Sequence, residues 1–143
     1  MKFVMTQAVC EAGMTMLNGK ADVYIANNPD PNTYLDEMKD ADALIVRIAK
    51  CDGNAIDQSP NLKVIGKTGV GVDAIDVAKA TSLGIPVVIT PGANSRSVAE
   101  HTVGFMFALS KNLCESDREL RNGNWKIRDA GKAIELEGKS VGI

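Results

Sequence analysis

The fold class of this 143-residue chain is set by the stretch Leu62-Lys63-Val64-Ile65-Gly66-Lys67-Thr68-Gly69-Val70-Gly71-Val72-Asp73. Its apolar start is short and rich in Val and Ile, which is typical of a strand buried on both faces of a parallel sheet. A helical pattern follows over Ile75–Leu83 and stops at Gly84. Asp73 and Asp76 stand where they can cap that helix. This part of the chain therefore predicts a strand, a glycine-containing turn and a helix.

Four more apolar runs flank the run at Leu62–Gly66. They cover Lys2–Thr6, Asp22–Ala26, Ala43–Arg47 and Pro86–Thr90. Segments with helical spacing lie between them, at Ala8–Asn18, Pro31–Lys39 and Asn54–Gln58. Alternation of this kind predicts an α/β fold, an open parallel five-stranded sheet with flanking helices and right-handed crossovers.

A longer helix is expected from Ser97 to about Asn112. Ser97-Val98-Ala99-Glu100 has the form of a capping box, in which the two polar side chains accept hydrogen bonds from free main-chain N–H groups. Apolar residues are spread round most of this helix, at Val98, Val103, Phe105, Met106, Phe107, Leu109 and Leu113. Because a helix that is apolar on nearly all sides is buried on nearly all sides, we expect a long apolar helix between domains or subunits.

The remaining residues are more polar. A helix from about Glu115 to Arg121 is expected to end at Asn122-Gly123, with Trp125 in a charged loop. The last residues, Gly138 to Ile143, begin a new strand. We therefore expect one domain over 1–96, helices and a loop over 97–137, and over 138–143 the first strand of a further, truncated domain. A shortened expression product, a proteolytic fragment or a truncated gene product would each give such an ending.

Composition excludes several classes of function. Apolar residues make up 45% of the chain and the formal net charge is −2, so no basic field points to nucleic acid. No apolar run approaches the roughly 18 residues of a membrane span, and the N-terminus lacks the pattern of a secretory signal. The three cysteines, Cys10, Cys51 and Cys114, are widely spaced and indicate neither a disulfide framework nor a metal site. We expect reduced thiols in a cytoplasmic protein with no membrane partner.

The first candidate site is the turn Gly69-Val70-Gly71-Val72-Asp73-Ala74, which matches the dinucleotide pattern Gly-x-Gly-x-x-Gly/Ala. A true dinucleotide site also needs an acidic residue at the end of the next strand, and Ile89-Thr90-Pro91-Gly92 supplies none. Two interpretations remain open. The glycines either serve the backbone of a tight turn or form a cradle of N–H groups for a carboxylate or phosphate. Arg47 and Lys67 end neighbouring strands and would add positive charge there.

The second candidate is the loop Thr90–Ser97, which leads into the long helix. It is either a loop with a good N-cap or an edge whose side chains face the same strand ends as the glycine turn. His101, the sole histidine, lies beside Glu100 in the first turn of that helix. Without a partner or a pocket we interpret it as structural.

The order of these features resembles the D-2-hydroxyacid dehydrogenases, and among them the 3-phosphoglycerate dehydrogenase type. The resemblance covers nearly the whole chain. It implies a flavodoxin-like substrate (catalytic) domain over 1–96, interdomain or dimerisation helices and a loop over 97–137, and over 138–143 the first strand of a truncated Rossmann NAD-binding domain. It rests on linked motifs in a fixed order: Leu44-Ile45-Val46-Arg47, residues 61–73, Gly84-Ile85-Pro86-Val87, Thr90-Pro91-Gly92-Ala93-Asn94, Ser97-Val98-Ala99-Glu100-His101-Thr102, Gly123-Asn124-Trp125 and residues 135–143.

The resemblance also implies an NAD-dependent oxidoreductase that transfers hydride at C2 of a D-2-hydroxy or 2-oxo acid, 3-phosphoglycerate being one candidate. It places the substrate at Arg47, Lys67, Gly69, Val70, Gly71 and Asn94. It places the cofactor at Val70, Ser95, Val98 and Thr102. Lysine at 67 replaces an arginine of some members, which weakens a bidentate contact with phosphate.

No residue here matches the family's catalytic Arg, Glu and His, and His101 is not that histidine. We therefore expect these 143 residues to be inactive by themselves. The resemblance assigns the 97–113 helix to the interface of a homodimer. An alternative remains, a non-catalytic dimerising or anion-binding module, because the apolar helix and the glycine turn suffice for that.

Overall fold

The computed structural model describes residues 1–28 and 30–142. The chain divides into two compact units, Met1–Ala93 and Asn94–Ile143. The division falls at Ala93, slightly before the end of the substrate domain expected at residue 96.

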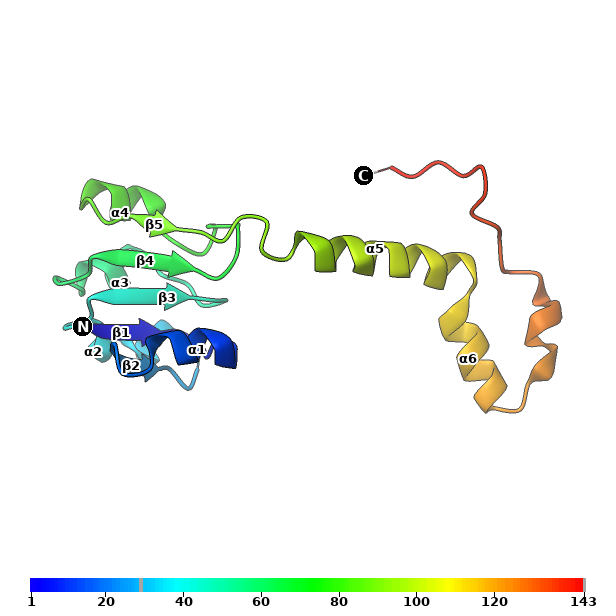
Figure 1. Ribbon diagram of the computed structural model, residues 1–143, viewed down its shortest axis with the longest axis horizontal. Coiled ribbons are helices and arrows are strands. Elements are labelled where there is room, and N and C mark those ends of the chain that lie inside the picture. Colours follow the sequence, from blue (N-terminus) through cyan, green and yellow to red (C-terminus); the bar gives the residue numbers. More distant parts are fainter. Residues whose placement is uncertain (29, 143) are drawn as a thin grey trace. The chain divides into compact units, whose positions relative to one another are not determined.

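The first unit contains a five-stranded parallel sheet (Figure 1). Its strands are β1 (Lys2–Met5), β2 (Asp22–Ile25), β3 (Ala43–Val46), β4 (Val64–Lys67) and β5 (Val87–Val88). Their order is β2-β1-β3-β4-β5. The open parallel sheet predicted from the sequence is thus confirmed, with the strand order of flavodoxin-like folds.

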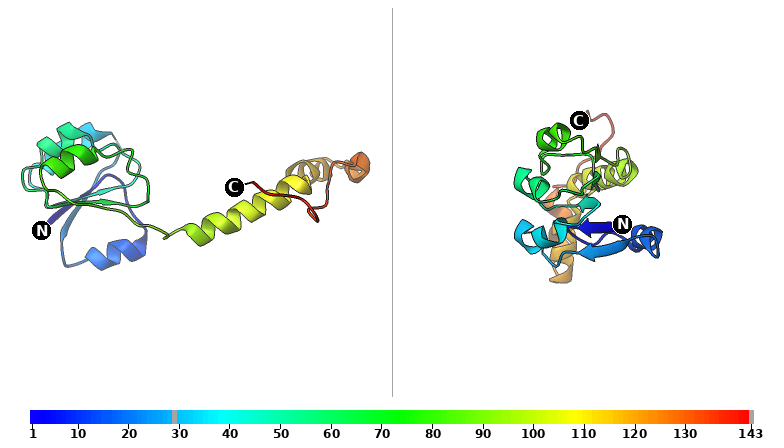
Figure 2. Two further views of the ribbon diagram at one scale, coloured as in Figure 1. Left: turned by 90° about the horizontal axis from the view of Figure 1, so that it is seen from above. Right: turned by 90° about the vertical axis from the view of Figure 1, so that its left-hand side faces the viewer.

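Helices lie on both faces of this sheet. Figure 2 shows α1 (Glu11–Leu17) on one face, and α2 (Leu35–Met38), α3 (Gly53–Asp57) and α4 (Val77–Ser82) on the other. A row of register partners, Val4, Leu44 and Ile65, crosses the three central strands, and all three side chains are fully buried. They belong to the main apolar core together with Tyr34, Met38, Ala55, Ile56 and Ala80. Burial of each large apolar side chain contributes about 1.5–3 kcal/mol.

Several predicted ends differ from the structure. Predicted Pro31–Lys39 is divided into a 3-10 turn, η1 (Pro31–Thr33), and α2, because Asp30 Oδ1 accepts from Asn32 N at 3.0 Å and starts a separate turn. β5 is shorter than the predicted Pro86–Thr90, since only Val87 and Val88 pair with β4. Asp76 caps α4 as predicted, by accepting from Lys79 N at 2.9 Å, whereas Asp73 does not cap it.

The second unit contains α5 (Ser95–Ser110), α6 (Leu113–Arg121) and the 3-10 segment η2 (Trp125–Ala130). The capping box predicted at Ser97 and Glu100 is wrong. The N-cap of α5 is Asn94, and no side chain caps this end. Ser97 therefore lies inside the first turn, where its hydroxyl cannot serve as an N-cap.

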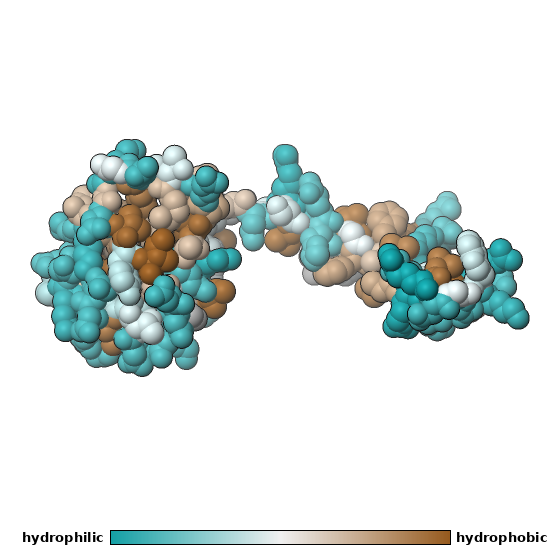
Figure 3. Space-filling model, turned by 90° about the horizontal axis from the view of Figure 1, so that it is seen from below, coloured by the Kyte–Doolittle hydropathy of each residue, from teal (hydrophilic) through white to brown (hydrophobic). Residues whose placement is uncertain are grey.

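The long apolar helix expected from the sequence is not found as such. α5 opens with polar Ser95, Arg96 and Ser97, and Glu100, His101 and Thr102 are polar as well. The helix was expected to be buried on nearly all sides, but many of its large apolar side chains are exposed, among them Val98, Val103, Phe105, Phe107 and Leu109. Apolar side chains are visible on the surface of this unit in Figure 3. Within the described part of the chain, no helix combines the length and apolarity needed to cross a membrane.

Residues 138–142 pair with no strand among the described residues, and Gly138 turns with a φ of +70°. Ile143 lies outside the described residues. The strand expected over 138–143 therefore remains a prediction.

Candidate functional site

Arg47 and Lys67 meet at the carboxyl edge of the sheet. Val46 is the register partner of Lys67, and Arg47 is the next residue along the chain after Val46. The Lys67 ammonium donates to the Arg47 main-chain carbonyl. The Arg47 side chain is exposed, and its Nη1 donates to the Ala8 carbonyl at 3.4 Å. Ligands of open parallel sheets bind at this edge, so both cations stand where an anion can reach them.

The glycine turn lies at the same edge, directly after β4. Thr90 N donates to the Gly69 carbonyl at 3.0 Å, which ties the turn to the chain leaving β5. Throughout the described residues, the main-chain N–H groups of Gly69, Val70 and Gly71 donate to no carbonyl or side chain. Successive free N–H groups in a turn are suited to bind an anion.

The two glycines do not supply the left-handed backbone of a tight turn. Neither Gly69 nor Gly71 has a positive φ, so neither position requires glycine for a left-handed backbone. A Cβ on Gly71 would lie 3.2 Å from Asp73 Oδ2, whereas one on Gly69 would meet only Lys67 Cε at 3.9 Å. The absence of a side chain at Gly71 therefore leaves space for the Asp73 carboxylate. That same carboxylate lowers the positive potential of the turn.

A depression of about 530 Å³ adjoins Arg47 and is lined by Ala8, Val9, Cys10, Arg47 and Thr68. The loop Ala8–Cys10 was not predicted to take part. It follows β1 in the middle of the sheet, so a position directly after a central strand was the signal that could have found it.

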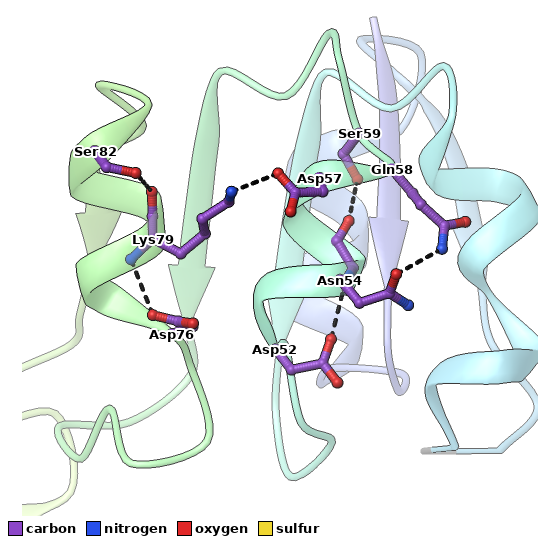
Figure 4. A network of polar contacts seen from close by, with 9 residues as sticks. Asp52, Asn54, Asp57, Gln58, Ser59, Asp76, Lys79 and Ser82 are labelled. Carbon is purple, nitrogen blue, oxygen red and sulfur yellow. Dashed lines mark hydrogen bonds and ion pairs between the residues drawn. The ribbon is translucent and has the colours of Figure 1, made fainter.

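The loops of this edge rest on two helices that are fixed to each other. Asp52 Oδ1 caps α3 by accepting from Ala55 N at 3.0 Å, and Asp76 caps α4. Lys79 Nζ of α4 then pairs with Asp57 Oδ1 of α3 at 2.6 Å (Figure 4). The two caps thus fix the starts of α3 and α4, and the ion pair joins α4 to the C-terminal residue of α3.

Cys51 is buried below the same loops. Desolvation, with smaller contributions from the carboxylates of Asp52 and Asp76, raises the pKa of its thiol to about 12. The thiol is therefore protonated at neutral pH and is a poor nucleophile. Across residues 1–28 and 30–142, no group of three His, Cys, Asp or Glu side chains could hold a metal ion.

A second depression, of about 490 Å³, runs along one face of α5. It is lined by Asn94, Ser95, Val98, Ala99, Thr102, Val103 and Met106. Every residue of the second unit that was predicted to bind substrate or cofactor is among them. Thr102 Oγ1 donates to the Val98 carbonyl at 2.8 Å, so its hydroxyl proton is used within the helix.

Val70, the remaining residue that was predicted to contact the cofactor, does not line this depression. Val70 belongs to the first unit and is 53% exposed. The His101 ring packs edge-on against Phe105, with 4.1 Å between ring centroids.

The fold defines an α/β domain of the flavodoxin-like kind, with a glycine turn and two cationic side chains at the carboxyl edge of its sheet. The family described as D-isomer specific 2-hydroxyacid dehydrogenase, catalytic domain, matches residues 3–137. The chain belongs to this family, and the resemblance found in its motifs is confirmed.

Individual relatives are longer than this chain. The D-3-phosphoglycerate dehydrogenase of Methanocaldococcus jannaschii is 41% identical over 143 residues, which cover 99% of this chain and 27% of that protein. The glyoxylate reductase of Thermofilum pendens is 35% identical over 99% of this chain and 44% of its own length. A solved structure, the NAD-dependent formate dehydrogenase from Staphylococcus aureus in complex with NAD, matches with a TM-score of 0.80 and 28% identity. That match covers 97% of this chain and 47% of the formate dehydrogenase chain. The chain thus spans less than half of each relative.

Proposed function

We propose that this chain is the substrate-binding part of an NAD-dependent oxidoreductase that acts on the CH–OH group of a D-2-hydroxy acid. One observation carries the proposal: Arg47, Lys67 and the free N–H groups of Gly69–Gly71 share one edge of the sheet. The N–H groups would hold the C1 carboxylate, because fixed main-chain dipoles need no reorganisation when the acid binds. The names of the relatives support this substrate class.

Arg47 and Lys67 would hold a second anionic group at the far end of the substrate. 3-Phosphoglycerate has a carboxylate at one end and a phosphate at the other, so it satisfies both parts of the edge. A guanidinium can pair with phosphate through two parallel hydrogen bonds, and the Lys67 ammonium would add a point charge. A short acid without a second anion would leave both cations unpaired.

NAD is the cofactor we propose, and its nicotinamide would supply or accept the hydride. Val70 and the α5 residues Ser95, Val98 and Thr102 would face it, with Asn94 beside the substrate. The apolar depression along α5 suits a flat ring that is shielded from water. Because no residue matches the family's catalytic Arg, Glu and His, we propose that these 143 residues alone have no turnover. Oxidation of NADH by the purified chain with any 2-oxo acid would contradict this.

The substrate proposal is tested by NMR titration of the ¹⁵N-labelled chain with 3-phosphoglycerate and, separately, D-glycerate. Both acids should shift the amide signals of Gly69, Val70 and Gly71. Arg47→Ala should weaken 3-phosphoglycerate about tenfold, since a hydrogen bond to a charged group contributes about 1.5–3 kcal/mol. D-Glycerate affinity should change less than about twofold, because that acid has no phosphate for the guanidinium.

A matched control is Arg128→Ala, which removes the same charge from an exposed arginine of the second unit. It should alter neither titration. The proposal fails if the turn amides respond to neither acid.

A second function, dimerisation without catalysis, is favoured by the exposed apolar side chains of α5. Val103, Phe105 and Phe107 are each about half exposed, and Leu109 is 81% exposed. Such surfaces commonly mark protein–protein contacts. The proposed substrate edge lies in the first unit and is not used by this contact, whereas α5 would carry both the cofactor residues and the dimer contact.

A further inference from the structure

The segment Arg47–Cys51, which follows β3, is held at its start by side chains that follow β1. Thr6 Oγ1 accepts a hydrogen bond from Arg47 N at 3.2 Å. Gln7 Oε1 accepts one from Ile48 N at 3.0 Å. Thr6 is fully buried, so its hydroxyl is fixed in place. The position of the Arg47 main chain is therefore set by β1 as well as by β3.

The end of the same segment is held by a buried tyrosine. The Tyr34 hydroxyl donates to the Lys50 carbonyl at 2.6 Å, and the Tyr34 side chain is fully buried. Burial also raises the pKa of this hydroxyl, so it remains a donor at neutral pH. A rigid phenol in a closed site can hold Lys50 O in only one place.

A main-chain bridge connects this segment to the loop that contains the glycine turn. Cys51 N donates to the Ala74 carbonyl at 2.7 Å, and Asp76 N donates to the Cys51 carbonyl at 2.9 Å. Cys51 and Ile75 thus form an isolated parallel pair beyond the sheet. The segment that carries Arg47 and the loop that follows Gly69–Gly71 are fixed to each other.

We infer that Tyr34 and Gln7 are positioning residues, which set the Arg47 guanidinium at the right distance from the glycine turn for a substrate with two anionic ends. The inference rests on the proposed function. Neither side chain needs to touch the ligand: each acts through the main chain of Arg47–Cys51. A displacement of about 1 Å in a supporting segment can cost a large factor in binding or rate, because a fixed cation loses less freedom when it pairs.

The test compares two tyrosines that each donate to a main-chain carbonyl. Tyr34→Phe removes the hydroxyl that holds Lys50 O. Tyr24→Phe is the matched control, because the Tyr24 hydroxyl donates to the Thr33 carbonyl at 3.3 Å, outside the Arg47–Cys51 segment. Each variant is titrated with 3-phosphoglycerate and with D-glycerate, and the amide shifts of Gly69–Gly71 report binding.

Tyr34→Phe should weaken 3-phosphoglycerate about three- to tenfold and leave D-glycerate within about twofold. Tyr24→Phe should change neither. In an Arg47→Ala background, Tyr34→Phe should cause no further loss, because the group that it positions is gone. Gln7→Ala should give the same selective loss, and it serves as the measurement if Tyr34→Phe does not fold.

Equal weakening of both acids by Tyr34→Phe or Gln7→Ala would show a merely structural role and overturn the inference. Unchanged 3-phosphoglycerate binding in both variants would overturn it as well. If Arg47→Ala does not weaken 3-phosphoglycerate binding, the proposal of a substrate with two anionic ends is wrong, and the inference fails with it. If Arg47→Ala weakens binding while the other two variants do not, only the inference fails.

Discussion

Cys51 has no exposed surface, whereas Cys10 and Cys114 are exposed. Its pKa is raised from 9.0 to about 12, first by burial and then by the carboxylates of Asp52 and Asp76. The folded state therefore keeps this thiol protonated in the range where an unfolded chain would lose the proton. Stability linked to Cys51 is complete below pH 9 and declines as the pH rises toward 12.

We predict that iodoacetamide at pH 8 modifies Cys10 and Cys114 but leaves Cys51 intact until urea unfolds the chain. Alkylation requires both access and a thiolate, and Cys51 has neither in the folded state. Mass spectrometry of digested samples would identify the modified residues. Alkylation of Cys51 at the rate of Cys10 in the folded chain would contradict its burial.

Single residues of the candidate site were predictable where they end a strand or directly follow one. Arg47, Lys67 and the glycine turn each follow an apolar run, and parallel strands bring such positions to one edge. Thr6, Gln7 and Tyr34 were not predicted, because they act on main-chain atoms of residues distant in sequence. No spacing rule connects Tyr34 with Lys50. Their contacts exist only once β1, β3 and α2 are packed.

The helices α3 and α4 each begin at an aspartate whose carboxylate accepts a main-chain N–H. An N-cap of this kind satisfies a donor that the helix leaves free, and its loss typically costs about 1 kcal/mol. Asp73 was expected to share this task with Asp76. The structure shows that only Asp76 caps α4, because Val77 is the first helical residue.

Asp76→Ala should lower the free energy of unfolding by about 1 kcal/mol, whereas Asp73→Ala should change it by less than about 0.5 kcal/mol. Both substitutions remove one exposed carboxylate, so their difference isolates the cap. Urea denaturation followed by circular dichroism measures both values. Equal losses in the two variants would mean that the Asp76 contact contributes nothing.

Elements were predicted more reliably than their ends. Apolar runs located all five strands, since burial on both faces demands apolar residues throughout. The capping box failed because Ser97-Val98-Ala99-Glu100 has the right residues three positions too late: the N-cap is Asn94 and the helix starts at Ser95. A local motif cannot show that the preceding loop, Pro91–Asn94, already turns into the helix.

The whole chain consists of two units of different character. The first buries its large side chains around a sheet, whereas the second leaves many apolar side chains of α5 exposed. We predict that the chain self-associates through α5. Leu109→Lys should weaken the association at least tenfold, because it places a charge in an apolar contact. Leu109 is 81% exposed, so the substitution should not disturb the fold.

Sedimentation velocity over a range of concentrations would measure this association. Met16→Lys is the control, since Met16 is 70% exposed but belongs to α1 of the first unit. It should leave the association unchanged. A wild-type chain that stays monomeric up to about 100 μM would contradict a dimer, because a specific contact of even μM affinity would be populated there.

The strand order β2-β1-β3-β4-β5 affects how the protein forms during synthesis. β1 is made before the other four strands of this sheet, yet it pairs on one side with β2 and on the other with β3. With only β1 and β2 released, the nascent chain holds a two-stranded ribbon that is marginal in water. The sheet can grow only after Ala43–Val46 has emerged and closed a long loop, and such non-local pairing slows folding. β1 must therefore stay unaggregated until Ala43–Val46 has been made.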